Sequence, residues 1–251
     1  MLNQQTYDKL GTLKLIAFRK ALEAQYNNSS YNSMGFYERV GIAVDELFDD
    51  RECKKRERAR KKANFKESAC LEDISYDNKN GLDKHLIDNL ATGQYVEKKQ
   101  NISITGPTGV GKTRLSCALG DQAVRQGYSV LYYRLSRLIE AFDIAVSDGT
   151  MPKLRAMLVK ANLLILDDWA LTPLSPQARQ ELLELIDDRS GNGSIIITSQ
   201  LPVKDWHSYI GEATIADALL DRLIHRSHQI ELRGESLRKV YGKKELEESG
   251  K

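Results

Sequence analysis

A phosphate-binding loop is the strongest chemical signal in this sequence. The pattern G-x-x-x-x-G-K-[ST] is matched at every fixed position. The loop and the residue after it are Gly106, Pro107, Thr108, Gly109, Val110, Gly111, Lys112, Thr113 and Arg114. A strand-like stretch precedes it (101–105) and a helical apolar pattern follows it (114–125). In that setting backbone N–H groups and a helix N-terminus bind a polyphosphate, Lys112 reaches the β- and γ-phosphates, and the Thr113 hydroxyl binds Mg²⁺.

Two carboxylates end an apolar run further along the chain. The run 163–166 is typical of a buried strand in a parallel sheet, and Asp167 and Asp168 follow it directly. Beside a phosphate loop, the first carboxylate holds Mg²⁺ opposite the Thr113 hydroxyl, usually through water. The second can orient and polarise an attacking water. We therefore assign Asp167 to magnesium and Asp168 to water activation.

Strand-like and helical stretches alternate around these residues. Strands are expected at 101–105, 128–133, 163–167, 194–198 and 228–232. Five strands with helical crossovers predict an α/β fold with an open, mostly parallel sheet and the phosphate loop after its first strand. If the fourth strand lies beside the first, a polar side chain at its end, in the segment Thr198–Gln200, faces the γ-phosphate.

Composition limits the class of protein and its location. The chain has 251 residues, a formal net charge of +2 and 41% hydrophobic residues, as in ordinary globular proteins. No run approaches the ~20 apolar residues of a membrane-spanning helix. The N-terminus shows no secretory signal, and the three cysteines are widely separated. We expect a cytoplasmic protein that does not contact a membrane.

The N-terminal part reads as a small helical domain. One helix is expected over 3–26 and a second around 36–48. We expect three regions in total. They are a helical domain with a basic linker (1–67), an ATPase domain (68–242) and a charged, frayed tail (243–251).

The linker is strongly basic although the chain as a whole is nearly neutral. On a helix, Arg51, Lys55, Arg58 and Lys62 share one face of the stretch 51–66. Such a face can bind nucleic-acid phosphates through counterion release. A solvated helical linker explains the same pattern equally well, so both interpretations stay open.

Several segments in combination are specific to one family. They are the phosphate loop, LLILDDWA, IIITSQLPVKDW, ADALLDRLIHRSHQIEL and RGESLRK. From about Gly11 to Lys239 the sequence resembles the IstB-like ATPases, which assist transposition of an insertion sequence. These are related to the helicase loader DnaC and, more distantly, the initiator DnaA in the AAA+ superfamily. The resemblance implies an ATPase that assembles with ATP into rings or spirals on duplex DNA and passes the target complex to a transposase.

The resemblance also implies roles for single residues. Ser199 matches the first sensor position, and Arg222 matches the arginine finger supplied across a subunit interface, with Arg226 as a weaker candidate. Arg238 matches the second sensor arginine. Too little chain follows Leu232 in this sequence for the C-terminal helical lid common in the superfamily, so we expect none.

The resemblance points to DNA contacts and to a slow reaction. By analogy with the initiators, the stretch 135–160 forms an extra helical element that faces DNA. Its candidate phosphate contacts are Arg134, Arg137, Lys153 and Arg155. Many relatives carry Glu where this chain has Asp168, which is one methylene shorter. We therefore expect hydrolysis that is slow or that needs the assembled state.

Three functions compete on the sequence alone. The leading one is an ATP- and Mg²⁺-dependent ATPase that oligomerises on largely arbitrary duplex DNA and recruits or stimulates a transposase, with hydrolysis driving disassembly. A DnaC-like helicase loader is the alternative, and it should favour single-stranded DNA. A small-molecule kinase is a third possibility, although the sequence has no motif for an acceptor pocket.

Overall fold

The structure is a computed structural model that describes residues 4–74, 76 and 81–236. The chain divides into two compact units, Met1–Arg58 and Ala59–Lys251, which are described separately below. The first boundary was predicted after residue 67, slightly later in the chain than this division after Arg58. The predicted tail (243–251) lies outside the described residues. Within the described ranges, no helix is long and apolar enough to cross a membrane.

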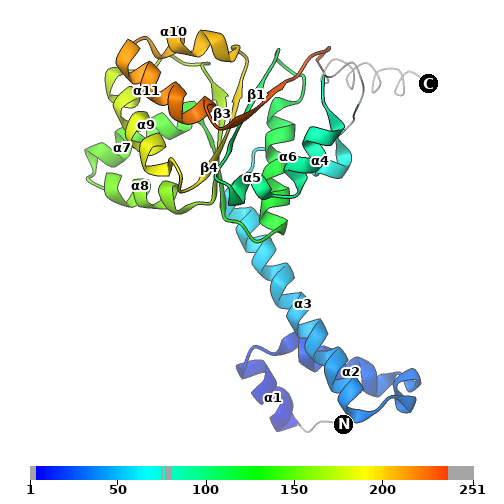
Figure 1. The fold of residues 1–251 in the computed structure, drawn as a ribbon. Coiled ribbons are helices and arrows are strands. Elements are labelled where there is room, and N and C mark those ends of the chain that lie inside the picture. Colours follow the sequence, from blue (N-terminus) through cyan, green and yellow to red (C-terminus); the bar gives the residue numbers. More distant parts are fainter. Residues whose placement is uncertain (1–3, 75, 77–80, 237–251) are drawn as a thin grey trace, which may run out of the picture. The chain divides into compact units, whose positions relative to one another are not determined.

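The first unit is built from helices (Figure 1). They are α1 (Gln4–Thr12), α2 (Ile16–Asn27), η1 (Ser29–Ser33) and most of α3 (Phe36–Ala63). The prediction of one continuous helix over 3–26 is wrong, because the chain leaves the helix between α1 and α2. Residue 3 of that predicted helix lies outside the described residues. Lys14 adopts a left-handed φ of 57°, and the Leu15 N–H donates to the Leu10 carbonyl at 2.9 Å. This is a Schellman motif, which ends a helix by satisfying its last carbonyls.

Helix α3 joins two stretches that the sequence pattern treats separately. It continues without interruption from the apolar segment that begins at Phe36 through the basic stretch to Ala63. Arg51, Arg58 and Lys62 are all exposed on it. The basic linker is therefore helical over most of its length, as the shared-face argument requires.

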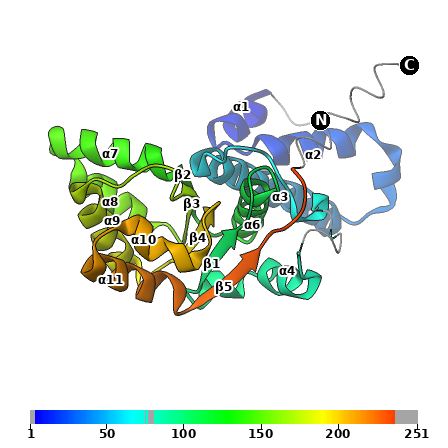
Figure 2. The same ribbon diagram turned by 90° about the horizontal axis from the view of Figure 1, so that it is seen from above.

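The second unit contains a five-stranded parallel sheet in the order β2-β3-β4-β1-β5 (Figure 2). Its strands are β1 (Asn101–Thr105), β2 (Val130–Arg134), β3 (Leu163–Trp169), β4 (Ser194–Ser199) and β5 (Ser227–Glu231). The predicted α/β fold with a parallel sheet is confirmed. Strand β4 lies between β1 and β3, so the phosphate loop and the paired aspartates follow strands that are separated by one strand.

Helices cover both faces of this sheet (Figures 1 and 2). One face carries η2 (Leu71–Asp73), α4 (Lys84–Ala91), α5 (Gln94–Glu97) and α6 (Lys112–Arg125). The other carries α7 (Leu135–Ser147), α8 (Met151–Lys160), α9 (Pro176–Arg189), η4 (Val203–Asp205), α10 (Trp206–Ile210) and α11 (Ala213–Ile224). Each face packs its own buried apolar cluster, which explains why the central strands are apolar at nearly every position.

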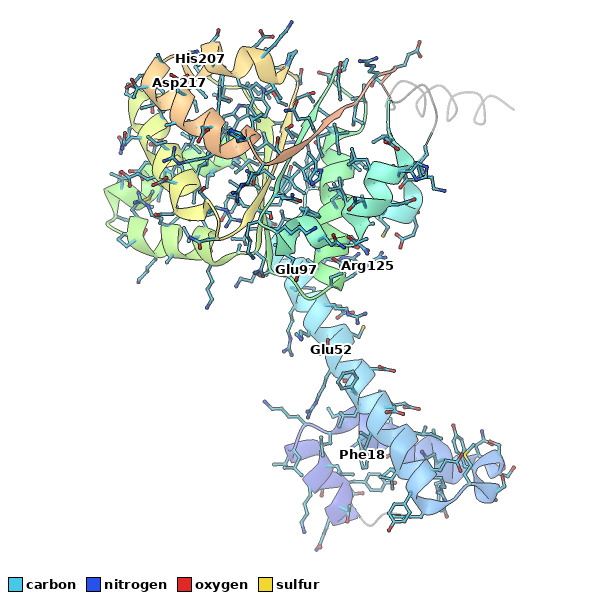
Figure 3. The ribbon with its side chains drawn as sticks, in the orientation of Figure 1. Phe18, Glu52, Glu97, Arg125, His207 and Asp217 are labelled. Carbon is cyan, nitrogen blue, oxygen red and sulfur yellow. The ribbon has the colours of Figure 1, made fainter. Side chains whose placement is uncertain are left out.

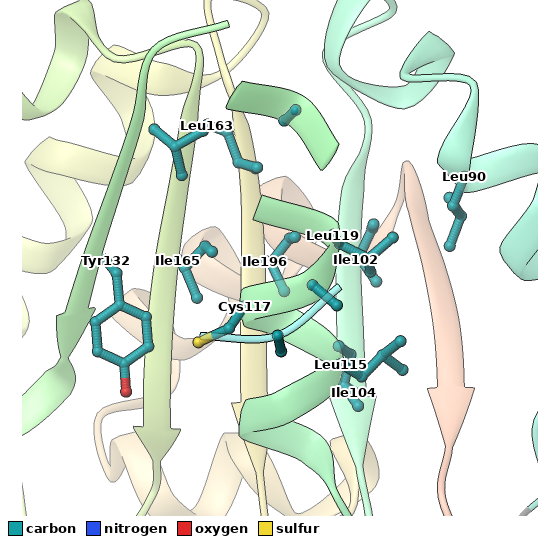
Figure 4. Close-up of a cluster of buried hydrophobic side chains, with 14 of the residues drawn as sticks. Leu90, Ile102, Ile104, Leu115, Cys117, Leu119, Tyr132, Leu163, Ile165 and Ile196 are labelled. Atoms are coloured by element: carbon teal, nitrogen blue, oxygen red, sulfur yellow. The ribbon is translucent and has the colours of Figure 1, made fainter. Parts of the chain in front are cut away.

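Alternation along the strands decides which side chains meet α6. Ile165 and Ile196 pack in the cluster beneath α6 (Figure 4). Leu166 and Ile197 pack in the cluster on the opposite face. Successive strand residues point to opposite faces, so the residues two positions further on also lie on the α6 side. This alternation decides on which face of the sheet the polar residues at the carboxyl ends of the strands lie.

Charged residues fasten helices to one another within this unit. Arg125, labelled in Figure 3, lies 3.0 Å from Asp121 in its own helix and 2.7 Å from Glu72 in η2. Arg189 at the end of α9 is fully buried and donates to the carbonyls of Ala161 (2.8 Å) and Ser194 (2.7 Å). Burial lowers the pKa of its guanidinium to about 10. Arg189 therefore ties the end of α8 and the start of β4 to α9.

Candidate nucleotide-binding site

The phosphate loop connects β1 to α6 in a backbone shape that requires glycine. Gly106 has a φ of 146°, and a Cβ there would lie 2.2 Å from the Leu232 carbonyl oxygen. Gly111 has a φ of 102° and caps the N-terminus of α6. Only glycine adopts these angles readily. The N-terminus of α6 and its free N–H groups therefore open toward the space above the loop, where a helix attracts anions.

Lys112 holds the loop in this shape. Its ammonium donates to the Gly106 and Pro107 carbonyls, each at 2.7 Å. Burial lowers the pKa of Lys112, and the charges of Asp168 and Asp167 partly oppose that shift. The ammonium thus stays at the centre of the loop, and phosphate oxygens are better partners for it than neutral carbonyls are.

Thr113 and Asp167 meet across the start of α6 and the end of β3. The Thr113 hydroxyl lies 3.0 Å from Asp167 Oδ1 and 3.1 Å from Oδ2. A hydroxyl and a carboxylate supply the hard oxygen donors that Mg²⁺ prefers, so these two residues fit the predicted ion. The Asp167 side chain is fully buried, and its further donors are the hydroxyls of Tyr132 (2.5 Å) and Thr198. Strand alternation puts the side chains of Tyr132, Asp167 and Thr198 on the face of the sheet that α6 covers.

The structure corrects the choice of hydroxyl at the end of β4. The resemblance assigns the first sensor to Ser199, but Ser199 points to the face of the sheet opposite α6, where its fully buried hydroxyl donates to the Trp169 carbonyl at 2.9 Å. Its neighbour Thr198 shares the α6 face with Asp167. The reason is the period of two along a strand, which puts adjacent residues on opposite faces.

Asp168 leaves the strand geometry and turns into the site. It has a left-handed φ of 61°, which Asp tolerates better than most residues, and the pairing of β3 with β4 shifts register between Leu166 and Trp169. Its N–H donates to Thr198 Oγ1 at 3.2 Å, and its carboxylate lies 3.5 Å from Arg134 Nε. Asp168 therefore points into the space above the phosphate loop, as water activation requires.

A pocket of ≈ 420 Å³ lies above the phosphate loop. Its lining comprises Lys66, Glu67, Thr108, Gly109, Gly111, Lys112, Thr113, Arg114, Arg134, Asp168, Leu171 and Gln200. Lys66, Tyr132, Thr198 and Gln200 are functional candidates that sequence reasoning either missed or ranked too low. Gln200 accepts a hydrogen bond from the Thr108 hydroxyl at 2.7 Å, which links β4 to the loop. The available signal for Tyr132 was its place in β2 two residues after the buried Val130, since alternate residues of a strand lie on the same face.

Arg222, the predicted arginine finger, does not line the pocket above the phosphate loop of its own chain. Arg222 on α11 lies 2.6 Å from Asp187, and its carbonyl accepts from Asn101 at the amino end of β1. With Arg226 it lines a second pocket of ≈ 430 Å³ at that edge of the sheet, opposite the edge that carries the phosphate loop. Arg238 lies outside the described residues, so its role stays a prediction.

The predicted DNA contacts have different environments. Arg134 lines the nucleotide pocket, so its side chain does not extend away from it as expected of a DNA contact. Arg155 is only 29% exposed and pairs with Glu181 at 2.7 Å, which fastens α8 to α9. Arg137 is exposed on α7, where it pairs with Glu140 at 2.6 Å. Lys153 is exposed near the start of α8.

Comparison with known proteins identifies the family of this chain. The family model "IstB-like ATP binding protein" matches residues 8–245. A putative insertion sequence ATP-binding protein of Sinorhizobium fredii is 43% identical over 239 residues, which cover 95% of this chain and 98% of that protein. A second such protein, from the insertion sequence IS1162 of Pseudomonas fluorescens, is 47% identical and covers 80% of this chain and 88% of its own.

A solved structure shares the fold. DnaA of Aquifex aeolicus bound to AMPPCP, an ATP analogue, has a TM-score of 0.59 at 20% identity, over 73% of this chain and 56% of that chain. At that level of identity the likeness concerns the fold alone. The family match covers the phosphate loop, both aspartates and Arg222. The chain therefore belongs to the family of IstB-like ATP-binding proteins.

Proposed function

We propose that this chain is a cytoplasmic ATPase that oligomerises on target duplex DNA, recruits or stimulates a transposase, and leaves the DNA when ATP is hydrolysed. The observation that carries the proposal is that Lys112, Thr113 and Asp168 line one pocket above the loop, while the buried Asp167 accepts a hydrogen bond from Thr113 beside it. Each of these side chains supports one part of an ATPase cycle.

Binding of ATP depends on the loop and the start of α6. The triphosphate lies along the loop backbone, and Lys112 exchanges its two carbonyl partners for β- and γ-phosphate oxygens. Thr113 and Asp167 would hold Mg²⁺, which would supply positive charge that offsets the charge of the phosphates. Tyr132 and Thr198 keep the Asp167 carboxylate in place by donating hydrogen bonds to it. These donors fix the carboxylate before the ligand arrives.

Hydrolysis requires an oriented water molecule and a stabilising cation. Asp168 accepts a proton from the attacking water, and Thr198, whose Oγ1 accepts from the Asp168 N–H, fixes the backbone beside it. Thr198 thus takes the sensor role first given to Ser199. Arg222 lies at the opposite edge of the sheet, so it serves the pocket of a neighbouring subunit, and Arg238 completes the site as the second sensor. Assembly and hydrolysis are thereby coupled.

DNA binding is assigned to the exposed basic face of α3. Arg51, Arg58 and Lys62 are exposed there, whereas Arg155 is engaged with acidic residues of α9. Arg137 and Lys153 remain as contacts from α7 and α8. Contacts of this kind bind phosphates with little regard to sequence, and their affinity falls steeply with salt. The relatives are named as ATP-binding proteins of insertion sequences, which supports a transposase as the partner.

A helicase loader is the competing function. It is supported by the likeness to the DnaC helicase loader, which has a TM-score of 0.55 at 16% identity over 68% of this chain and 99% of that chain. The two functions differ in the DNA they prefer. Anisotropy titrations with labelled duplex and single strands of equal length, with ATP and Mg²⁺, separate them. We expect tighter binding to duplex, and a preference for single strands would support the loader instead.

A further inference from the structure

Lys66 reaches the nucleotide pocket from a segment remote in the sequence. It follows α3, which ends at Ala63, and Asn64 directly after the helix has a left-handed φ of 57°. Ala63 and Ala69, on either side, are buried in the cluster beneath α6, and Phe65 packs against that cluster. Any Cβ added at Gly120 on α6 would lie 2.7 Å from the Phe65 ring. The backbone at Lys66 is therefore held against α6.

The ammonium of Lys66 balances the charge of Asp167. Its Nζ lies 3.8 Å from Asp167 Oδ2, and 29% of its side chain is exposed. Among the described residues, this is the one ion pair that Asp167 makes, and its other partners are neutral hydroxyls. Lys112, the other lysine nearby, is occupied by the loop carbonyls. A buried carboxylate without an opposite charge is strongly unfavourable, so Lys66 stabilises the site when it holds no divalent cation.

The same position lies against the expected path of the triphosphate. Lys66 lines the pocket together with Lys112, Thr113 and Asp168. A divalent cation at Thr113 and Asp167 would repel the Lys66 ammonium, whose flexible four-carbon stem allows it to turn away. Phosphate oxygens in the same pocket would attract it. Lys66 thus has one partner in the empty site and another in the filled site.

We propose that Lys66 is a second lysine of the nucleotide site, which neutralises Asp167 in the absence of Mg²⁺ and contacts a phosphate oxygen when a nucleoside triphosphate is bound. The proposal rests on the proposed ATP-binding function. Because Lys66 supplies positive charge that Mg²⁺ would otherwise supply, it reduces the dependence of ATP affinity on Mg²⁺. The ratio of ATP affinities with and without Mg²⁺ therefore reports its role.

The test measures ATP binding by calorimetry in excess Mg²⁺ and in EDTA, with no DNA present. For Lys66→Met we expect the affinity in EDTA to fall by about tenfold or more, as for loss of a charge-assisted hydrogen bond, and the affinity in Mg²⁺ to fall much less. Lys66→Arg keeps the charge and should recover most of the affinity in EDTA. Lys84→Met, which removes an exposed charge at the start of α4, is the matched control and should behave like the wild type.

Two negative results have different meanings. If wild-type protein binds no ATP even with Mg²⁺, the proposed function fails. If it binds ATP and Lys66→Met shows the wild-type ratio of affinities, the role of Lys66 is refuted while the proposed function stands. An equal loss of affinity in both conditions would also refute it, because it would indicate a purely structural residue. Should Lys66→Met fold poorly by circular dichroism, Lys66→Gln gives the same comparison.

Discussion

Replacing Tyr132 with Phe tests whether the carboxylate of Asp167, the proposed magnesium ligand, is held in position before an ion binds. The Tyr132 hydroxyl is buried and lies 2.5 Å from Asp167 Oδ2, and Figure 4 shows it directed toward the carboxyl ends of the strands. A hydrogen bond to a charged group contributes about 1.5–3 kcal/mol. Phe keeps the ring packing, so we expect the free energy of unfolding to fall by about that amount.

Urea unfolding in EDTA, followed by far-UV circular dichroism, measures this change. Tyr133→Phe is the matched control, because Tyr133 packs on the opposite face of β2 and its hydroxyl makes no hydrogen bond seen among the described residues. It should change stability by less than about 0.5 kcal/mol. We also expect Tyr132→Phe to weaken Mg²⁺ affinity in the ATP complex by about tenfold, since such supporting partners orient the ligand. Equal stability of the two variants would refute the role of Tyr132.

Two further variants probe hydrolysis and packing. Asp168→Asn should preserve ATP binding and lower the rate of hydrolysis by at least about 100-fold, because the amide cannot accept the proton of the attacking water. A phosphate-release assay showing the wild-type rate would contradict that role. Arg189→Met should lower the free energy of unfolding by about 2–6 kcal/mol, because the Ala161 and Ser194 carbonyls lose their donor. A wild-type midpoint in urea would mean that other groups satisfy these carbonyls.

The sequence predicted best what is continuous along the chain. The phosphate loop is a run of adjacent residues whose spacing defines its chemistry, and the buried strands have apolar runs that only a doubly covered sheet favours. The break between α1 and α2 was missed because it depends on a left-handed Lys14, a conformation that side-chain type does not reveal.

The site was harder to predict where it depends on which face a side chain occupies. Thr198 and Ser199 are both short hydroxyl residues, and only the register of β4 shows that Thr198 meets Asp167. Lys66 stands in a run of basic residues that all look alike in sequence. Packing of Phe65 and Ala69 against the α6 side distinguishes it, and such packing is visible only in three dimensions.

We propose above all that ATP bound above the phosphate loop assembles this chain on duplex DNA. Sedimentation velocity of the protein with duplex DNA and Mg²⁺, with and without ATP, tests it most directly. We expect large complexes only with ATP, and none for Lys112→Ala, whose loop lacks the ammonium needed to bind phosphates. Monomers under every condition, or equal assembly of the wild type and Lys112→Ala, would contradict it.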